Sequence, residues 1–87
     1  MLEISVTETF ARLYQKLLKS VREKADLKTQ LFRQNSFYPS LRTKKLEPHH
    51  EDVWSFWIDK DYRIKFRFLD AHRVHFLYIG DRKDIYR

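Results

Sequence analysis

The chain has 87 residues, which suffices for one domain, so we expect residues 1–87 to form a single unit. With 43% hydrophobic and 16% aromatic residues and only one Gly, the composition excludes a disordered or collagen-like chain. The absence of Cys excludes a disulfide framework and a thiolate metal site. Because no run of about 20 apolar residues predicts a membrane span, we expect a cytoplasmic protein without a membrane partner.

The charge of the chain favours a polyanionic partner. Eighteen Lys and Arg against twelve Asp and Glu give a net charge of +6. Residues 1–41 hold seven basic and four acidic side chains, and residues 42–87 hold eleven and eight, so each part carries +3. The positive charge therefore belongs to the folded domain rather than to a basic tail.

The first part of the chain predicts a strand and two helices. Apolar and polar residues alternate over residues 2–6, which is typical of a short half-buried strand, and Thr7 can then cap a helix. The apolar stripe that follows is interrupted by lysines after Val21, and Ser20-Val21-Arg22-Glu23 has the pattern of a capping box. We therefore expect helices at 8–19 and 21–34. The first stripe consists of Phe10, Leu13, Tyr14, Leu17, Leu18 and Val21.

The second part predicts a sheet. We expect residues 35–52 to be extended or looped, and strands at 53–59, 62–69 and 73–79, because the connections between them are short enough for hairpins. The order is then β-α-α-β-β-β. This is an α+β domain in which the N-terminal helical hairpin packs on one face of an antiparallel sheet.

The strand expected at 62–69 carries three cations on one face. Arg63, Lys65 and Arg67 alternate with apolar residues, so the three cations share the face opposite the core. Such a row is either a solvated outer face or a surface that meets phosphates. The row contains no acidic residue, which favours phosphates. The apolar row comprises Tyr62, Ile64, Phe66 and Phe68.

Two further segments add candidate residues. Lys44 and Lys45 form a pair just before the sheet, which by itself is typical of a solvated charge pair. Gly80 permits a tight turn or bulge after the last strand, which would re-aim Arg82 and Tyr86. From composition alone, Tyr86 covers the edge of the core as readily as it serves a site.

The histidines do not predict a metal site. His49 and His50 are adjacent in a loop beside acidic residues, and neighbours of this kind rarely converge on one ion. His72 and His75 flank a turn and a strand, and we expect His75 to be partly exposed rather than catalytic. The chain also lacks a Gly-rich phosphate loop and a nucleophile elbow, so we expect no metal and no cofactor.

Three segments in this order and spacing resemble motifs of the RelE/ParE superfamily, the bacterial and archaeal toxins of type II toxin–antitoxin modules. The resemblance covers essentially the whole chain. The segments are Tyr38-Pro39-Ser40-Leu41-Arg42-Thr43-Lys44-Lys45-Leu46, then Trp54-Ser55-Phe56 with Asp61-Tyr62-Arg63-Ile64, and Ile79-Gly80-Asp81-Arg82-Lys83-Asp84-Ile85-Tyr86.

The resemblance implies a RelE-like, microbial-RNase-like fold and a metal-independent endoribonuclease. Its active branch cuts mRNA in the ribosomal A site by attack of a ribose 2′-hydroxyl on the adjacent phosphate. By position, it implies that Arg63 holds the scissile phosphate, Arg82 is an acid or phosphate ligand, and Tyr86 stacks on the nucleotide. It implies that Lys44 or Lys45 is the base or stabilises the phosphorane. Around this catalytic set we expect RNA to be bound by Lys65, Arg67, Arg42 and Lys83.

The chain departs from the family where many relatives carry His, because Lys44 and Arg82 stand there. No His remains at a motif position as a general base, so we expect either a weak enzyme or one that depends wholly on the ribosome, with His49 or His50 as substitute bases. Two alternatives stay open, a ParE-like DNA gyrase inhibitor and a degenerate, inactive toxin domain. In each case the resemblance implies a cognate antitoxin, and the basic domain favours an acidic one.

Overall fold

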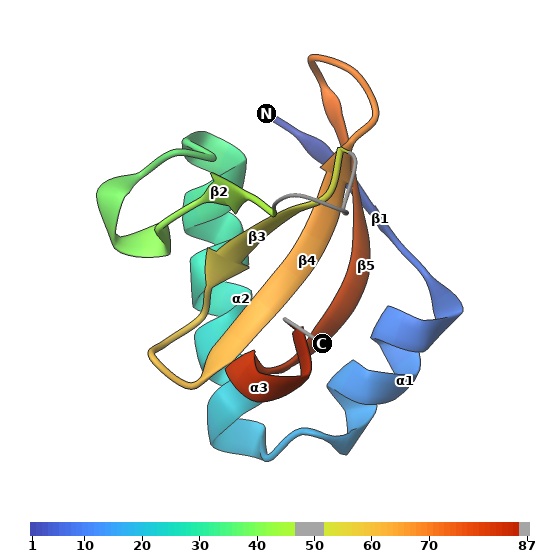
Figure 1. Cartoon of the computed structure of the whole chain (residues 1–87), viewed down its shortest axis with the longest axis vertical. Coiled ribbons are helices and arrows are strands. Elements are labelled where there is room, and N and C mark those ends of the chain that lie inside the picture. The colour runs from blue at the N-terminus through green and yellow to red at the C-terminus, as the bar shows by residue number, and fades with distance from the viewer. Residues whose placement is uncertain (47–51, 86–87) are drawn as a thin grey trace.

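A computed structural model describes residues 1–46 and 52–85, which form a five-stranded sheet with helices on both sides (Figure 1). Helices α1 and α2 form a hairpin behind the sheet, whereas the short α3 lies in front of it. No helix in these two segments is both long and apolar enough to cross a membrane. In chain order the elements are β1 (Glu3–Val6), α1 (Glu8–Lys16), α2 (Lys19–Gln34), the 3₁₀ helix η1 (Pro39–Leu41), β2 (Lys44–Lys45), β3 (Trp54–Trp57), β4 (Tyr62–Phe68), β5 (Arg73–Asp81) and α3 (Arg82–Ile85).

The α+β class and the helical hairpin on one face are confirmed, but the sheet is mixed rather than antiparallel. Its strand order is β1-β5-β4-β3-β2, and β1 pairs with β5 in parallel, whereas all other pairs are antiparallel. The hairpin carries the chain across the sheet to the far edge, and the meander β2–β5 then leads back to β1. The segment expected to be extended or looped contributes the edge strand β2.

The helix boundaries differ from the predicted ones at the junction of α1 and α2. Thr7 caps α1 as predicted, because its Oγ accepts a hydrogen bond from the Phe10 N–H at 2.9 Å. The prediction of a capping box at Ser20 is wrong, since α2 begins at Lys19, two residues before the predicted start, and has no side-chain cap. Instead, Arg22 donates from its guanidinium to the Leu17 carbonyl at 2.8 Å and so satisfies the end of α1.

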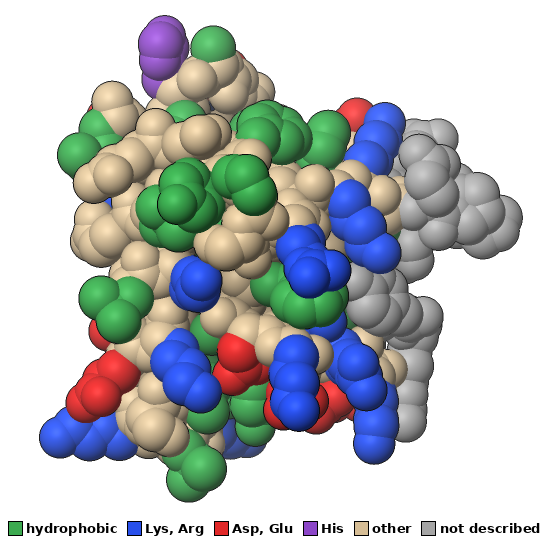
Figure 2. Space-filling view, turned by 90° about the vertical axis from the view of Figure 1, so that its left-hand side faces the viewer, with side chains coloured by type: hydrophobic (Ala, Val, Ile, Leu, Met, Phe, Trp, Pro, Cys, Tyr) green, Lys and Arg blue, Asp and Glu red, His purple; other side chains and the backbone are tan. Residues whose placement is uncertain are grey.

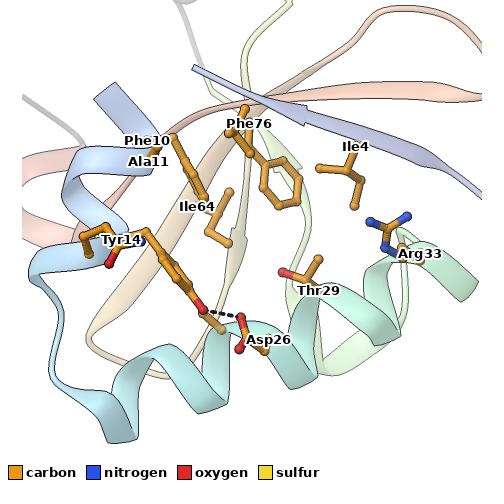
Figure 3. Close-up of a pocket in the computed structure, with 12 residues that line it drawn as sticks. Ile4, Phe10, Ala11, Tyr14, Asp26, Thr29, Arg33, Ile64 and Phe76 are labelled. Atoms are coloured by element: carbon orange, nitrogen blue, oxygen red, sulfur yellow. Dashed lines mark hydrogen bonds between the residues drawn. The ribbon is translucent and has the colours of Figure 1, made fainter. Parts of the chain in front are cut away.

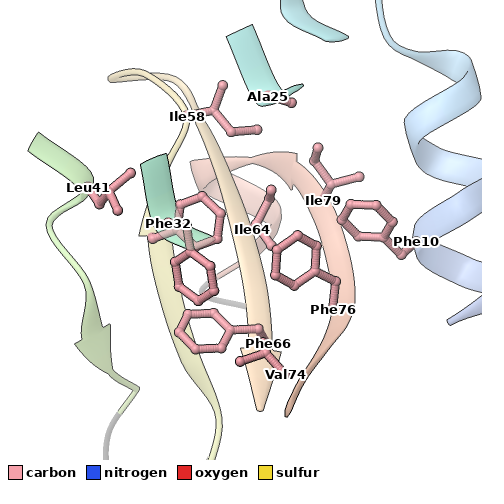
Figure 4. Packing of buried hydrophobic residues seen from close by; sticks show 11 residues of the cluster. Phe10, Ala25, Phe32, Leu41, Ile58, Ile64, Phe66, Val74, Phe76 and Ile79 are labelled. Atoms are coloured by element: carbon pink, nitrogen blue, oxygen red, sulfur yellow. The ribbon is translucent and has the colours of Figure 1, made fainter. Parts of the chain in front are cut away.

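The core lies between the helical hairpin and the sheet and is rich in aromatic rings (Figure 4). Phe32 of α2 is fully buried, stacks on Phe56 with ring centroids 4.6 Å apart, and meets the edge of Phe66 at 4.9 Å. Ile64 and Phe66 of β4 are buried, as their alternation with the cations predicted. The buried members of this cluster are Phe10, Ala25, Phe32, Leu41, Phe56, Ile58, Ile64, Phe66, Val74, Phe76 and Ile79.

A bulge in β5 creates a second, smaller cluster on the outer side of the sheet. Lys65 pairs with Tyr78 and Phe66 with Phe76, so Leu77 has no partner in the register. Ile85 of α3 is fully buried, which fixes α3 against the outer side. The cluster consists of Leu46, Val53 and Ile85, with Leu77 and Tyr78 packed against it.

The prediction that Gly80 forms a turn after the last strand is wrong. Gly80 lies inside β5 without a positive φ, so its conformation does not require glycine. A Cβ atom at this position would lie 2.9 Å from Cε1 of Tyr78. The glycine therefore leaves room for the Tyr78 ring, which lies across the outer side of β5.

Candidate functional site

The register of the sheet brings several predicted residues onto its outer side. Lys44, Ser55, Lys65 and Tyr78 are opposite one another on four successive strands, about 4.8 Å apart from strand to strand. Two residues further along this side, Trp57 and Gly80 flank Arg63. We call Arg42, Lys44, Arg63, Lys65 and Arg82 the cation cluster.

Arg63 is the most buried of these cations, with 3% of its surface exposed. Its guanidinium donates to the carbonyl of Asp59 at 2.6 Å and to that of Tyr62 at 3.1 Å. Its Nε is buried and has no hydrogen-bond partner among the described residues. Backbone carbonyls of the β3–β4 turn, rather than a carboxylate, therefore hold this guanidinium in place.

Trp57 is the aromatic surface on which two guanidinium groups lie. The Cζ of Arg63 is 3.9 Å from the ring centroid, and the Cζ of Arg42 is 4.3 Å from it. Both distances are within the range of a cation–π contact. Arg42 is exposed whereas Arg63 is buried, so a ligand reaches the Arg42 guanidinium more easily.

The other two cations of β4 become progressively more exposed. Lys65 is half-buried, and its ammonium lies 5.6 Å from the centroid of the Tyr78 ring. Arg67 is exposed and lies opposite His75. His75 is half-buried, as predicted, and its Nδ1 lies 2.7 Å from the Ser5 hydroxyl.

The β3–β4 turn accepts hydrogen bonds from Arg63 and Arg82, the two arginines to which the resemblance assigns roles. Burial raises the pKa of Asp59, but the N–H groups of Asp61 and Tyr62 and the Lys24 ammonium outweigh it, so the pKa lies below its usual value. The turn held in this way offers the Asp59 carbonyl to Arg63. Its Asp61 carbonyl accepts the backbone N–H of Arg82 at 2.8 Å.

The remaining predicted residues do not all lie on the outer side of the sheet. Arg82 and Lys83 are exposed at the start of α3, which packs on the outer side through Ile85. Lys45 is opposite Trp54, whose ring packs against the core, so Lys45 lies on the helix-facing side and does not join Lys44. Tyr86, His49 and His50 lie outside the described residues.

The sequence patterns did not identify three residues of this site, namely Trp57, Tyr78 and Asp59. Trp57 lies two residues after Ser55, so strand alternation could have placed it on the side of the cations. Tyr78 could not be found in this way, because the bulge at Leu77 changes the side it faces.

Figure 2 shows the side that carries η1 and β2, where Lys and Arg side chains outnumber acidic ones. No carboxylate pairs with Arg42, Arg63 or Lys65 in the part of the chain that the structure describes. The same part contains no group of three His, Cys, Asp or Glu residues that could hold a metal ion. The chemistry that this cluster offers is the binding of anionic oxygens by guanidinium and ammonium groups.

A separate open cleft of about 320 Å³ lies on the helix-facing side, between the hairpin and the sheet (Figure 3). Its walls are apolar where Phe10, Ile64 and Phe76 line it, and Tyr14 donates to Asp26 at 2.7 Å at its rim. This hydrogen bond raises the pKa of Tyr14. The cleft contains none of the predicted site residues, so the candidate site is the outer side of the sheet.

Comparison with solved structures shows the fold of the chain, although no family model and no curated protein sequence matches it. A YoeB/ParE toxin from Agrobacterium tumefaciens is 15% identical with a TM-score of 0.77, over 93% of this chain and 99% of the other. YafQ from Escherichia coli is 15% identical with a TM-score of 0.77 over all of both chains. An archaeal RelE–RelB complex from Pyrococcus horikoshii matches at 14% identity and a TM-score of 0.75, over 93% and 94% of the chains. The chain therefore has the fold of RelE/ParE toxins.

Proposed function

We propose that this protein is the toxin of a type II toxin–antitoxin system and a metal-independent endoribonuclease that cleaves mRNA on the ribosome. The observation that supports the proposal is the cation cluster, of which Lys44, Arg63 and Lys65 share the outer side of the sheet by strand register, in a chain with the fold of RelE/ParE toxins. In the described part of the chain, the Trp57 ring and backbone carbonyls rather than carboxylates hold Arg42 and Arg63. This leaves positive charge available for a phosphodiester.

The proposed reaction is an attack of a ribose 2′-hydroxyl on the adjacent phosphate, which forms the new P–O bond as the bond to the 5′-oxygen breaks. Negative charge develops on the phosphorane oxygens, and the cation cluster can stabilise it there. Lys44 is our candidate to assist the 2′-hydroxyl, since it lies on the side of Arg63, whereas Lys45 does not. Arg82 is our candidate to stabilise or protonate the leaving oxygen.

We also propose an acidic antitoxin as the partner. The net charge of +6 and the exposed Arg42, Arg67 and Arg82 give the outer side a field that attracts an acidic segment. RelE in the similar archaeal structure is bound to RelB, which supports a protein partner here.

The test is primer extension on a defined mRNA with the purified protein, with and without translating ribosomes. We expect cuts in phase with codons that require ribosomes, and a loss of at least about tenfold in cleavage rate in Arg82→Ala. Arg82 is exposed, so this variant should fold. Arg12→Ala removes an exposed cation from α1 and serves as the charge-matched control that cleaves normally.

Other outcomes would contradict the proposal. Cleavage that is equal in Arg82→Ala and the wild type would contradict the role proposed for Arg82 at the leaving oxygen. Absence of cleavage together with double-strand DNA breaks in expressing cells would indicate the gyrase inhibitor instead. Absence of both, with normal growth on strong expression, would indicate a domain without toxic activity.

A further inference from the structure

Arg42 occupies a backbone conformation that arginine rarely adopts. Its φ of 49° and ψ of 43° place it in the left-handed region directly after η1. A side chain with a Cβ atom is disfavoured there relative to glycine, and such strain is retained where the surrounding structure over-determines it. The conformation of Arg42 therefore needs an explanation.

The residues around Arg42 fix this conformation. The preceding Leu41 is fully buried in the core, and the Arg42 N–H donates to the Pro39 carbonyl at 3.2 Å. The hydroxyl of the following Thr43 donates to the Ser36 carbonyl. Because both neighbours are anchored, the Arg42 side chain leaves the backbone in one direction, toward Trp57.

Trp57 thus has two guanidinium groups within 4.3 Å of its ring centroid, those of Arg42 and Arg63. Among the described residues no carboxylate neutralises either guanidinium, so both keep their positive charge. An anion that reaches an accessible guanidinium here gains charge-assisted hydrogen bonds without displacing a carboxylate. The arrangement fits the oxygens of a phosphodiester.

The two arginines are not equally available to that anion. Arg63 is 3% exposed and already donates to two backbone carbonyls, whereas Arg42 is exposed and its guanidinium donates no hydrogen bond to another described residue. We propose that the Arg42 guanidinium binds the RNA phosphate and that Trp57 positions this guanidinium. Arg63, which the carbonyls of the turn hold, in turn supports the Trp57 ring. This inference rests on the proposed function and names the phosphate-binding group of that site.

The test uses a fluorescein-labelled RNA oligonucleotide with 2′-O-methyl groups throughout, which binds without being cleaved because its 2′-oxygens cannot attack. Anisotropy gives the dissociation constant and its dependence on salt. In a Trp54→Phe background, Trp57 is the one remaining Trp of the chain, so its fluorescence reports contact at the proposed place.

We expect Arg42→Gln to weaken binding by about tenfold and to lower the slope of log K against log salt by about 0.7, the loss of one phosphate contact. Trp57→Leu should lower the slope equally although Arg42 is still present, whereas Trp57→Phe should keep most of it. Arg12→Gln, the charge-matched control on α1, should leave the slope unchanged. Arg42→Gly should bind as weakly as Arg42→Gln yet melt at a higher temperature than the wild type, because glycine relieves the backbone strain.

The outcomes separate the inference from the proposed function. If the wild type cleaves mRNA on ribosomes but Arg42→Gln keeps the wild-type affinity and slope, the inference is overturned and the proposed function stands. If ribosomes reveal no cleavage but the oligonucleotide changes Trp57 fluorescence only when Arg42 is present, the inference stands without the nuclease. A wild-type slope in Trp57→Leu overturns the positioning role, and a protein that shows neither cleavage nor binding overturns both proposals.

Discussion

The helix-facing side of the sheet packs aromatic rings against one another, whereas the outer side packs them against cations. On the inner side, Phe32, Phe56 and Phe66 are fully buried and contact each other edge-on or stacked. On the outer side, Trp57 and Tyr78 are half-buried and lie under guanidinium and ammonium groups. Burial stabilises the first arrangement, and the second holds charge in place where a ligand can meet it.

This difference indicates how a small basic domain separates stability from binding. The inner cluster buries large apolar surfaces, which contribute most of the folding free energy. On the outer side, no carboxylate pairs with Arg42, Arg63 or Lys65 in the described part of the chain, which costs stability but keeps positive charge available for an anion. Changes on the two sides should therefore have different consequences.

The largest effect on stability is expected from Phe32→Ala on the inner side. Phe32 is fully buried and lies within 5.8 Å of the ring centroids of three other Phe residues, so its removal leaves a large cavity. We expect a loss of about 3–5 kcal/mol in the free energy of unfolding, measured by urea denaturation. Leu27→Ala is the control, since Leu27 is on the same helix but 72% exposed, and an equal loss there would contradict this view of the core.

A smaller effect, dependent on pH, is expected from Asp59→Asn in the turn that serves the outer side. The folded-state pKa of Asp59 is lowered, so its carboxylate stabilises the fold above its unfolded pKa, and this contribution is lost as pH falls through the folded value. At pH 7 the variant should lose about 1 kcal/mol or less, because the N–H groups of Asp61 and Tyr62 lose a charged acceptor and the partly exposed ion pair with Lys24 at 3.4 Å disappears.

Denaturation curves from pH 7 to pH 2 check this prediction. The difference between wild type and Asp59→Asn should shrink below about pH 4, where the wild-type carboxyl is protonated. Glu23→Gln is the control, since this exposed carboxylate lies 4.0 Å from Lys19 and should show no such dependence. A difference that stays constant down to pH 2 would show that the charge of Asp59 does not stabilise the turn.

The smallest effect is expected from Ser55→Ala, at the centre of the outer side. The Ser55 hydroxyl is buried and has no hydrogen-bond partner within the described segments. Its replacement removes an unsatisfied polar group, so thermal unfolding should show a stability equal to the wild type or up to about 1 kcal/mol higher. A marked destabilisation would mean that this hydroxyl has a partner such as a buried water.

The sequence predicted the local patterns of this protein because they depend on neighbours along the chain. The alternation in β4 assigned Ile64 and Phe66 to the core and Arg63 to the other side, and all three lie there. The cap at Thr7 was found for the same reason. The motifs also led to the fold that the solved toxins share.

Only the tertiary structure decided how these patterns combine, since register and packing depend on residues far apart in the chain. The parallel pairing of β1 with β5 and the bulge at Leu77 are long-range features, and the bulge turned Tyr78 toward Lys65. Arg63 was expected in an open row of cations, but the turn carbonyls and Trp57 bury it. Composition sets the charge of a strand, whereas the strands beside it determine which of those charges a ligand can reach.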